Sequence, residues 1–584
     1  MSRAPWKGVV GSLAVLAVTA GLGTTVAAGS ASSASTSDCP AAASSVTPGE
    51  AVHGLTVSSG TTPDPFTGQV IGTLTDGIAP GVDLIMVDLT SPAIDQAGGV
   101  WGGMSGSPVY DGSGNLVGAV SYGLSWGAST VAGLTPASEM QKLFTEDASG
   151  AARAARRVTL GKRLAARVVA TGDATARQVA AGYAPLELPT VISGMQSPSR
   201  VHDLAVALGF TGRVLSGSAA DAAAPEYSVV TGGNLGVDVS YGLVSSYAYG
   251  TATEVCNGQV IGFGHPFTYR GATSLSMHGA YSLYVQKDPL GTPYKVVNLG
   301  APVGTITGDH LAGVFGTVGA TLQSDIATSK ATFGSRSRHG TTYITLPEAT
   351  PDLAPATMWT AQDRAMDYAG PGSATASWTI KGIREDGRSF SVSRADVFTS
   401  PYDIAYESAS ELGTELYQIW QSENLRITSV NTDSTISRQT GQYRIQRVQV
   451  RSGGGWQTVH NGQPVTVRAG TTRQLRVALT SASYGARTVI VGLAVPAGTA
   501  GASGDLRVYG GLEVAQSGDV YGDGGGGQSL DAVLRQIRTR PHRDEVVAEA
   551  TIAPEAGKAR TLHAATATGH VVSGFRSFAL RVVR

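Results

Sequence analysis

Short runs of apolar residues, separated by glycine, proline and aspartate, dominate the first half of the chain. Three of these runs have the length and the β-branched content of strands: 69–74, 83–89 and 115–122. Glycine-punctuated runs return from 227 to about 346, and apolar and polar residues alternate over roughly 370–516. A period of two places successive side chains on opposite faces of a sheet. The pattern therefore predicts a mainly β protein with one β-sandwich or two in its last third.

Helical patterns are few. Residues 136–144 predict a short helix, and Ala and Arg dominate 151–182, which we expect to be helical in part. A short amphipathic helix is expected at 530–540, where a proline follows it. The glycines of 524–527 precede this helix as a linker, and 545–584 again resemble strands.

The first residues have the layout of a secretory signal peptide. Arg3 and Lys7 supply a short positive region, the apolar stretch 8–28 follows, and small residues continue to Ser32. Gly and Thr interrupt the apolar stretch, which favours cleavage over a retained membrane anchor. We therefore expect a protein that is secreted or held at the cell surface, extracytoplasmic, with no membrane span after removal of residues 1–32.

The charge of the chain argues against one class of partner. Charged residues make up 15% of the sequence and the formal net charge is -1 at pH 7. Nucleic-acid binding depends on a basic field that neutralises phosphates. We therefore expect no nucleic-acid partner.

The chain has two cysteines, Cys39 and Cys256. In an oxidising compartment such a pair often forms a disulfide, and two free thiols are the alternative. No histidine stands at ligand spacing beside either cysteine, so no metal site is expected.

The most specific string is Gly-Gly-Met-Ser-Gly-Ser-Pro at residues 102–108. A serine hydroxyl becomes a nucleophile when a tight turn exposes it beside a base. The carbonyl oxygen that it attacks gains negative charge and needs backbone N–H donors. Gly103 would let the chain turn its own N–H and that of Ser105 into one pocket. The string therefore predicts Ser105 as nucleophile, with Gly103 and Ser105 forming the oxyanion hole, against the alternative of a plain Gly/Ser hairpin loop.

This string and the strand that follows it, which ends in Val-Ser-Tyr-Gly at 120–123, resemble the nucleophile region of chymotrypsin-like peptidases. In those enzymes the strand after the nucleophile pairs with the substrate backbone. The resemblance implies that Ser121, Tyr122 and Gly123 form the substrate-binding edge by β-augmentation.

His265 is the candidate general base. It stands in Gly-Phe-Gly-His-Pro-Phe at 262–267, after a short apolar run, where small neighbours leave the imidazole accessible. His53 lies in the lead-in and is more consistent with a surface residue. Together the 102–108 and 262–267 strings resemble the SpoIVB-type serine peptidase family, named for the stage IV sporulation protein B. In that protein the His precedes the Ser, whereas His265 follows Ser105, as in large secreted members of permuted order.

The orienting acid is the weakest member of the expected triad. The position that corresponds to the family's acid is Thr90 here. Asp83 opens an Asp-Leu-Ile-Met-Val-Asp-Leu strand that resembles the strand carrying the acid in chymotrypsin-like enzymes, so it ranks first. Asp88 ranks second and Asp95 third, and a solvated carboxylate is the alternative for each. Without an acid the tautomer of His265 would be unfixed and activity low.

The resemblance implies a chymotrypsin-like double β-barrel peptidase unit with permuted halves, followed by a C-terminal β-sandwich region. The expected organisation is a signal peptide at 1–32, a peptidase segment with the nucleophile at 33–146, an Ala/Arg-rich mixed connecting region at 147–225, a peptidase segment with the catalytic His at 226–350, a β-sandwich-like region at 351–516, and a glycine linker, short helix and terminal strands at 517–584.

The resulting hypothesis is a secreted serine endopeptidase that acts on protein or peptide substrates by acyl-enzyme chemistry, without a cofactor. The C-terminal β region would bind a substrate or a cell-envelope partner. Two alternatives stay open: a catalytically silent cell-surface scaffold or binding protein with a peptidase fold, and a protein that cuts its own region near 151–182.

Overall fold

The structure is a computed structural model. It describes residues 39–43, 45–144, 157–210, 212–215, 217, 223–288, 291–320, 322–460, 462–516, 528–553 and 559–584. The expected signal peptide and the 524–527 linker lie outside the described residues. Among the residues that are described, none of the helices combines the length and the apolar character that crossing a membrane requires.

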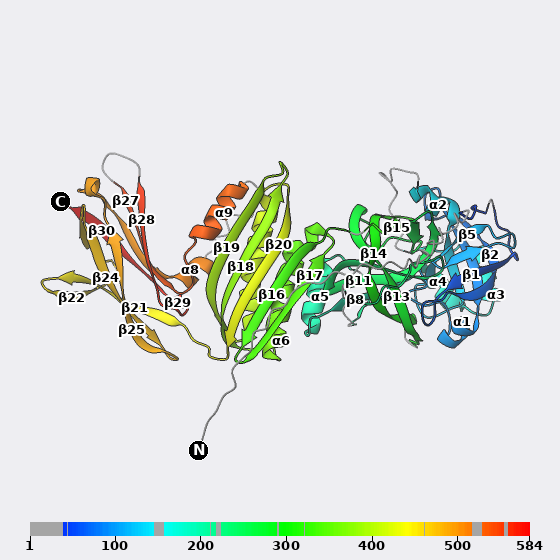
Figure 1. Cartoon of the computed structure of the whole chain (residues 1–584), viewed down its shortest axis with the longest axis horizontal. Helices are drawn as coiled ribbons and strands as arrows, with labels where there is room; N and C mark the ends of the chain where they lie inside the picture. The colour runs from blue at the N-terminus through cyan, green and yellow to red at the C-terminus, as the bar shows by residue number, and fades with distance from the viewer. Residues whose placement is uncertain are drawn as a thin grey trace, which may run out of the picture. The chain divides into compact units, whose positions relative to one another are not determined.

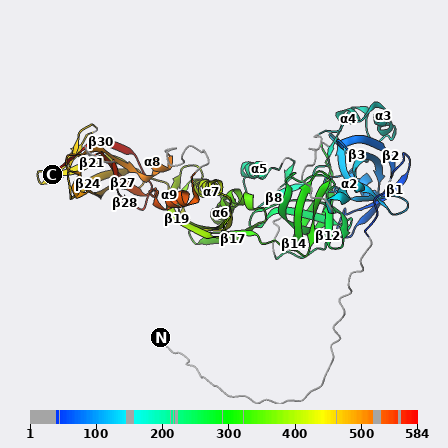
Figure 2. The same cartoon turned by 90° about the horizontal axis from the view of Figure 1, so that it is seen from above.

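The first sheet closes on itself. β1 pairs with β2 and β4, β2 with β3, β3 with β6, β6 with β5, and β5 with β4, so that six strands form a barrel (Figure 2, blue strands). Its strands are β1 (Ala51–Thr56), β2 (Asp64–Ala79), β3 (Val82–Thr90), β4 (Pro108–Tyr110), β5 (Leu116–Leu124) and β6 (Val131–Pro136). The three runs predicted from the sequence are all strands of this barrel.

Closure of this barrel depends on glycine, which has no side chain, and on shifts in the register of strand pairing. A Cβ at Gly118 would overlap the carbonyl oxygen of Thr135 on the adjacent strand. The pairing of β2 with β3 shifts between Val70 and Gly72, which bends the strand. The interior is apolar, with Val87, Trp101 and Val120 among its buried side chains.

Short helices flank the first barrel: α1 (Pro92–Ala97), α2 (Ala137–Gln141), the 3₁₀ helix η1 (Lys142–Phe144), α3 (Lys162–Ala170) and α4 (Ala176–Ala181). The helix expected at 136–144 is confirmed as α2 with η1. The Ala/Arg-rich region is helical in part, as expected, because its described residues include α3 and α4.

A second group of antiparallel strands also returns to its start. The pairing path β10-β13-β14-β15-β12-β11 ends with β11 paired to β10. These strands are β10 (Asn234–Gly242), β11 (Ser245–Cys256), β12 (Gln259–Gly262), β13 (Gly271–Gln286), β14 (Tyr294–His310) and β15 (Gly313–Val318). The chain passes from the first ring to this one through β7 (Tyr183–Pro185), which pairs with β5, and β8 (Thr190–Ser193), which pairs with β11. β9 (Val214–Leu215) and α5 (Pro198–Ala207) follow.

The sheet of the second ring continues through further strands. They are β17 (Arg336–Ile344), β16 (Asp325–Phe333), β20 (Leu425–Ser437), β18 (Gly372–Arg384) and β19 (Ser389–Ser400), in that order. After the 3₁₀ helix η2 (Pro347–Ala349), α6 (Thr350–Met366) packs against β16 and β17 and against α7 (Ile404–Ser422). These two helices were not expected. α6 buries 13 of its 17 residues, so its sequence lacks the polar stripe that reveals an amphipathic helix.

The C-terminal strands form two sheets around one apolar core. The first contains β21 (Tyr443–Ser452), β22 (Gly455–Val459), β24 (Thr472–Ser481), β25 (Gly485–Ala494) and β29 (Val572–Ser573); the second contains β23 (Val465–Arg468), β30 (Phe575–Val583), β26 (Ser503–Gly510), β27 (Glu545–Ala553) and β28 (Arg560–Ala567). The 3₁₀ helix η3 (Ala497–Thr499), α8 (Gly511–Gln516) and α9 (Leu530–Thr539) connect strands. The expectation of a mainly β protein is confirmed, as is the helix expected at 530–540.

Buried charges attach α9 to β19, beside which it lies in Figure 1. The Arg394 guanidinium lies 2.6 Å from the Asp396 carboxylate and 3.6 Å from Glu415 of α7, and it donates to the carbonyl oxygens of Ile537 and Arg540. Burial raises the pKa of Glu415 to about 7. A buried cluster of this kind is stable only while every charge keeps its partner.

Replacement of Arg394 by Met should therefore lower the free energy of unfolding by about 3–5 kcal/mol, because it leaves Asp396 without its buried counter-charge. The matched control is Arg388→Met, which removes an exposed arginine paired with Asp386. Urea denaturation of both variants measures the difference. Equal midpoints for the two variants would show that the buried cluster adds no stability.

Candidate active site

Ser105 lies in a tight turn between α1 and β4 and is 0% exposed. Gly103 and Gly106 within the turn have φ of +99° and +95°, which glycine adopts without strain. A Cβ at Gly106 would overlap the carbonyl oxygen of Thr251 in β11. The turn of the first barrel therefore packs directly on a strand of the second ring.

Three hydrogen bonds hold this turn against β11. The Thr251 amide donates to the Ser105 carbonyl at 2.8 Å, and the Thr251 hydroxyl donates to the Gly103 carbonyl at 3.1 Å. The Thr253 hydroxyl donates to the Gly106 carbonyl at 2.8 Å. Because every acceptor is a backbone carbonyl, the contact fixes the path of the turn and the position of the serine.

His265 follows β12 and reaches the same place from the second ring. Phe263 and Gly264 both have φ of +70°, so the chain reverses just before the histidine. The Thr135 hydroxyl of β6 donates to the Gly264 carbonyl at 2.5 Å. The Nε2 atom of His265 lies 2.9 Å from the Oγ atom of Ser105. The structure thus brings together the two residues that the sequence predicted as nucleophile and base.

The tautomer of His265 follows from its other nitrogen. Nδ1 lies 2.9 Å from the carbonyl oxygen of Pro266, which can only accept a hydrogen bond. Nδ1 therefore carries the proton, and Nε2 is left to accept the proton of Ser105. Burial of the ring lowers the pKa of His265; the Pro266 carbonyl, Asp309 and the Leu186 carbonyl oppose this without reversing it. The ring is neutral, and able to act as a base, at neutral pH.

The expected orienting acid is not beside His265. The Asp83 carboxylate in β3 accepts from the Asp76 amide at 3.0 Å, and the Asp88 carboxylate accepts from the Thr130 hydroxyl at 2.7 Å. Asp95 accepts from the Thr90 hydroxyl at 3.5 Å. Among the described contacts, the hydrogen-bond partner of His265 Nδ1 is a backbone carbonyl oxygen. None of the three aspartates forms a hydrogen bond with this nitrogen.

Asp309, at the end of β14, is the carboxylate that acts on His265. It is fully buried and accepts from the amides of Phe267 and Thr268, each at 2.7 Å, and from the Thr268 hydroxyl at 3.0 Å. The Arg270 amide donates to the same carboxylate at 3.3 Å. Asp309 therefore holds the turn that follows His265, and its charge favours the protonated ring. Sequence reasoning missed it, because nothing in its own segment distinguishes it from a strand-end aspartate.

The expected substrate-binding edge is occupied by the chain itself. β7 pairs antiparallel with β5, with Ala184 opposite Gly123 and Pro185 opposite Tyr122. The Leu186 amide donates to the Ser121 carbonyl at 2.8 Å. The Ser105 Oγ atom lies 3.2 Å from the Leu186 carbonyl oxygen. Segment 183–189 contains two prolines, which favour an extended chain before them, and this was the available sequence signal.

Two amides of the nucleophile turn are free to bind an oxyanion. Within the described part of the chain, the N–H groups of Gly103 and Ser105 donate no backbone hydrogen bond. The amide of Met104 donates to the Trp101 carbonyl at 3.0 Å, and that of Gly106 donates to a carbonyl of β5 at 2.8 Å. The two residues predicted to form the oxyanion hole are thus the ones whose amides lack a backbone acceptor.

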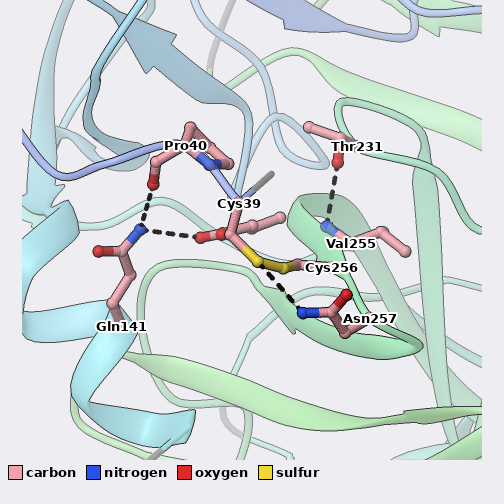
Figure 3. Close-up of a disulfide and its surroundings, with 8 residues drawn as sticks. Cys39, Pro40, Gln141, Thr231, Val255, Cys256 and Asn257 are labelled. Atoms are coloured by element: carbon pink, nitrogen blue, oxygen red, sulfur yellow. Dashed lines mark hydrogen bonds between the residues drawn. A yellow bond between two sulfur atoms is a disulfide. The ribbon is translucent and has the colours of Figure 1, made fainter. Parts of the chain in front are cut away.

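A disulfide joins Cys39 to Cys256 at the end of β11, as expected from the sequence (Figure 3). The side-chain amide of Gln141 donates to the Pro40 carbonyl at 3.0 Å and to the Glu254 carboxylate at 3.1 Å, which fixes the segment around Cys39. Cys39, Glu254 and Cys256 place ligand atoms within 4.8 Å of one another. Because both sulfurs are in the disulfide, neither supplies a thiolate for a metal.

No protein-family model, curated protein or solved structure matches this chain.

Lys295 of β14 lies below the nucleophile turn. Its side chain is fully buried, and its Nζ atom donates to the Asn234 side-chain oxygen at 2.7 Å. A Cβ at Gly103 would come within 3.0 Å of the Lys295 Cε atom, and the Lys295 amide donates to the Gly102 carbonyl at 2.9 Å. Burial lowers the pKa of Lys295 to about 7.

The titration of Lys295 predicts the pH dependence of stability. Between pH 7 and pH 10.5 the unfolded chain binds a proton at Lys295 that the folded chain has lost, so stability rises with pH across this window, by on the order of 4–5 kcal/mol. Lys295→Met should remove this rise and be more stable than wild type at pH 7. Urea denaturation from pH 6.5 to 9.5, which covers most of this window, should show a rise of on the order of 3 kcal/mol, with the exposed Lys330→Met as control. A wild-type slope that persists in Lys295→Met would exclude this lysine as its source.

Proposed function

We propose that this protein is a secreted serine endopeptidase. One observation carries the proposal: the Ser105 hydroxyl lies 2.9 Å from the His265 Nε2 atom and 3.2 Å from the carbonyl oxygen of a peptide bond. A nucleophile, a base of correct tautomer and a peptide carbonyl are the parts that acyl transfer requires.

The proposed reaction proceeds as follows. Ser105 Oγ attacks the substrate carbonyl carbon while His265 Nε2 takes the hydroxyl proton. The oxyanion that forms accepts from the amides of Gly103 and Ser105. His265 then gives its proton to the leaving amine, and water, activated by the same nitrogen, hydrolyses the acyl ester at Ser105. No cofactor takes part in any step.

The arrangement of strands supports the proposal of a chymotrypsin-like fold. The serine comes from one closed ring of six strands and the histidine from a second ring, and they meet where the turn of Ser105 packs on β11. We propose a double barrel whose halves are permuted in the chain, since the Ser-bearing ring comes first. Its resemblance to the SpoIVB-type family remains a proposal carried by the 102–108 and 262–267 strings.

In this proposal Asp309, and not Asp83, positions His265. Asp309 acts through the backbone of residues 267–270 and through its charge, whereas the direct partner of the ring is a carbonyl. Triads tolerate differences in chain order because only their geometry matters.

The Cys39–Cys256 disulfide is consistent with an oxidising, extracytoplasmic location. The cell-envelope or substrate partner of the C-terminal β region is kept as a hypothesis; Tyr402, Tyr406 and Trp420 expose aromatic surface on and beside α7. A catalytically silent scaffold is the alternative function, and labelling of Ser105 decides between the two.

A fluorophosphonate serine-hydrolase probe should label the purified chain that lacks residues 1–32. We expect Ser105→Ala to abolish labelling and His265→Ala to slow it by at least about 10³-fold, because the unassisted hydroxyl is a weak nucleophile. Ser113→Ala, which removes an exposed serine of the turn after β4, should label as wild type does. Labelling of wild type and of Ser105→Ala at the same measurable rate would refute the assigned nucleophile.

The labelling rate should also depend on pH in a way that identifies the positioning acid. Because burial lowers the pKa of His265, wild type should keep its rate below pH 6.5, where free histidine is protonated. Asp309→Asn should slow labelling by about 10²-fold through displacement of the turn, and should move the acidic limb to lower pH, because it removes a charge that favours the protonated ring. Asp83→Asn should change neither. If Asp83→Asn slowed labelling and shifted the acidic limb while Asp309→Asn did neither, Asp83 would be the acid that orients His265, as the sequence suggested.

A further inference from the structure

The connection between the two rings of strands crosses the nucleophile. β7 pairs with the first barrel and β8 with the second ring, so residues 186–189 must pass between them. The bond between Leu186 and Glu187 lies at this crossing. Ser105 is 0% exposed and His265 is 3% exposed beneath it.

The segment before this bond makes the contacts of a bound substrate. Its backbone extends β5 as an added antiparallel strand, and the Leu186 amide donates to the Ser121 carbonyl at 2.8 Å. The Leu186 side chain is buried among the apolar side chains of the first barrel. A Cβ at Gly123 would come within 3.1 Å of the Leu186 Cδ1 atom and 3.9 Å of a Val100 methyl group, so glycine makes the room that the leucine fills.

The segment after the bond is held by the second ring. A Cβ at Gly102 would come within 2.8 Å of the Glu187 carbonyl oxygen, so the chain crosses the nucleophile turn closely. The Glu187 carboxylate accepts from the Arg213 amide, and the Pro189 carbonyl accepts from the Tyr249 amide at 3.4 Å. The two sides of the bond are thus fixed to different rings of strands.

We infer that the Leu186–Glu187 peptide bond is a substrate of Ser105 in the same molecule, an inference that rests on the proposed peptidase function. Ser105 Oγ bonds to the Leu186 carbonyl carbon as its proton passes to His265. The carbon–nitrogen bond to Glu187 breaks, and the Glu187 nitrogen takes that proton. Water then hydrolyses the Ser105–Leu186 ester, and the products are a carboxylate at Leu186 and an amine at Glu187.

One local movement separates the observed arrangement from attack. The Leu186 carbonyl oxygen now lies 3.2 Å from Ser105 Oγ. Attack requires a rotation of this peptide group that turns its carbonyl carbon toward Oγ and its oxygen toward the amides of Gly103 and Ser105. The segment that reaches the nucleophile is therefore 183–187, immediately after the 151–182 region for which self-cleavage was considered.

Cleavage at this bond leaves a covalent link between the products. Cys39 belongs to the piece that ends at Leu186, and Cys256 belongs to the piece that begins at Glu187. The two pieces would separate on a denaturing gel only after reduction. The nucleophile and the base would then lie on different polypeptides of one molecule.

The test uses the purified chain without residues 1–32, incubated at neutral pH, on denaturing gels with and without reductant and with mass spectrometry of the products. We expect one band without reductant and, after reduction, two fragments whose new termini are Leu186 and Glu187. Ser105→Ala should remain one chain under both conditions. The half-time of cleavage should be independent of protein concentration. A half-time that shortens in proportion to protein concentration would overturn cleavage within the molecule.

Variants at Leu186 supply the matched control. Leu186→Asp should block cleavage, because it brings a carboxylate into an apolar pocket, and Leu186→Met should retain it. Fragments from Ser105→Ala identical to those of wild type, or a cut at another bond, would overturn the inference.

The fluorophosphonate probe separates the two levels of the proposal. A wild-type chain that is labelled at Ser105 but stays uncut would overturn self-cleavage and leave the peptidase function standing, with segment 183–187 as a cover over the site. If wild type is uncut and unlabelled, and Leu186→Asp, whose segment should leave the pocket, is also unlabelled, the peptidase function itself fails.

Discussion

The contact between the Ser105 turn and β11 is the constraint on which the rest of the site depends. Gly106 lets a turn of one ring touch the backbone of the other, since any side chain there would overlap the Thr251 carbonyl. Hydrogen bonds from Thr251 and Thr253 to carbonyls of the turn then fix the approach. A 2.9 Å separation between a hydroxyl and an imidazole from two different rings requires a contact that is this close and this rigid. Displacement by even about 1 Å would remove a large part of the expected reactivity.

The same contact accounts for the polar groups buried around it. Asp309 is a fully buried carboxylate that is stable because backbone amides and a hydroxyl donate to it, and the turn it organises carries His265. Lys295 is also buried, but its one described side-chain acceptor is a neutral amide oxygen, so its pKa falls to about 7. The lysine shows how burial selects a charge state, since one neutral acceptor does not keep a buried ammonium group protonated.

Two covalent connections join the two rings of strands at the site. The connection from β7 to β8 runs over Ser105, and the Cys39–Cys256 disulfide forms a second connection between the same two rings. The site is therefore covered by its own chain in the intact molecule, while the rings would remain joined if that chain were cut. β7 pairs with β5 in the antiparallel arrangement that a peptide substrate would adopt at the proposed substrate-binding edge, so that edge and the cover are the same pairing of strands.

The sequence by itself determined the features that local chemistry controls. Glycine spacing around Ser105 and His265 identified the two turns, alternation predicted the strands, and cysteine count with an exported context predicted the disulfide. It did not reveal α6, which is buried nearly all round and so has no amphipathic period. Nor did it find the acid: Asp83, Asp88 and Asp95 lie near Ser105 in the sequence, and the segment of Asp83 resembles an acid-bearing strand, whereas Asp309 lies on β14, far along the chain from Ser105. Only the tertiary structure decided which carboxylate serves His265 and that Leu186 fills the site, because both follow from how two separately closed rings of strands pack together.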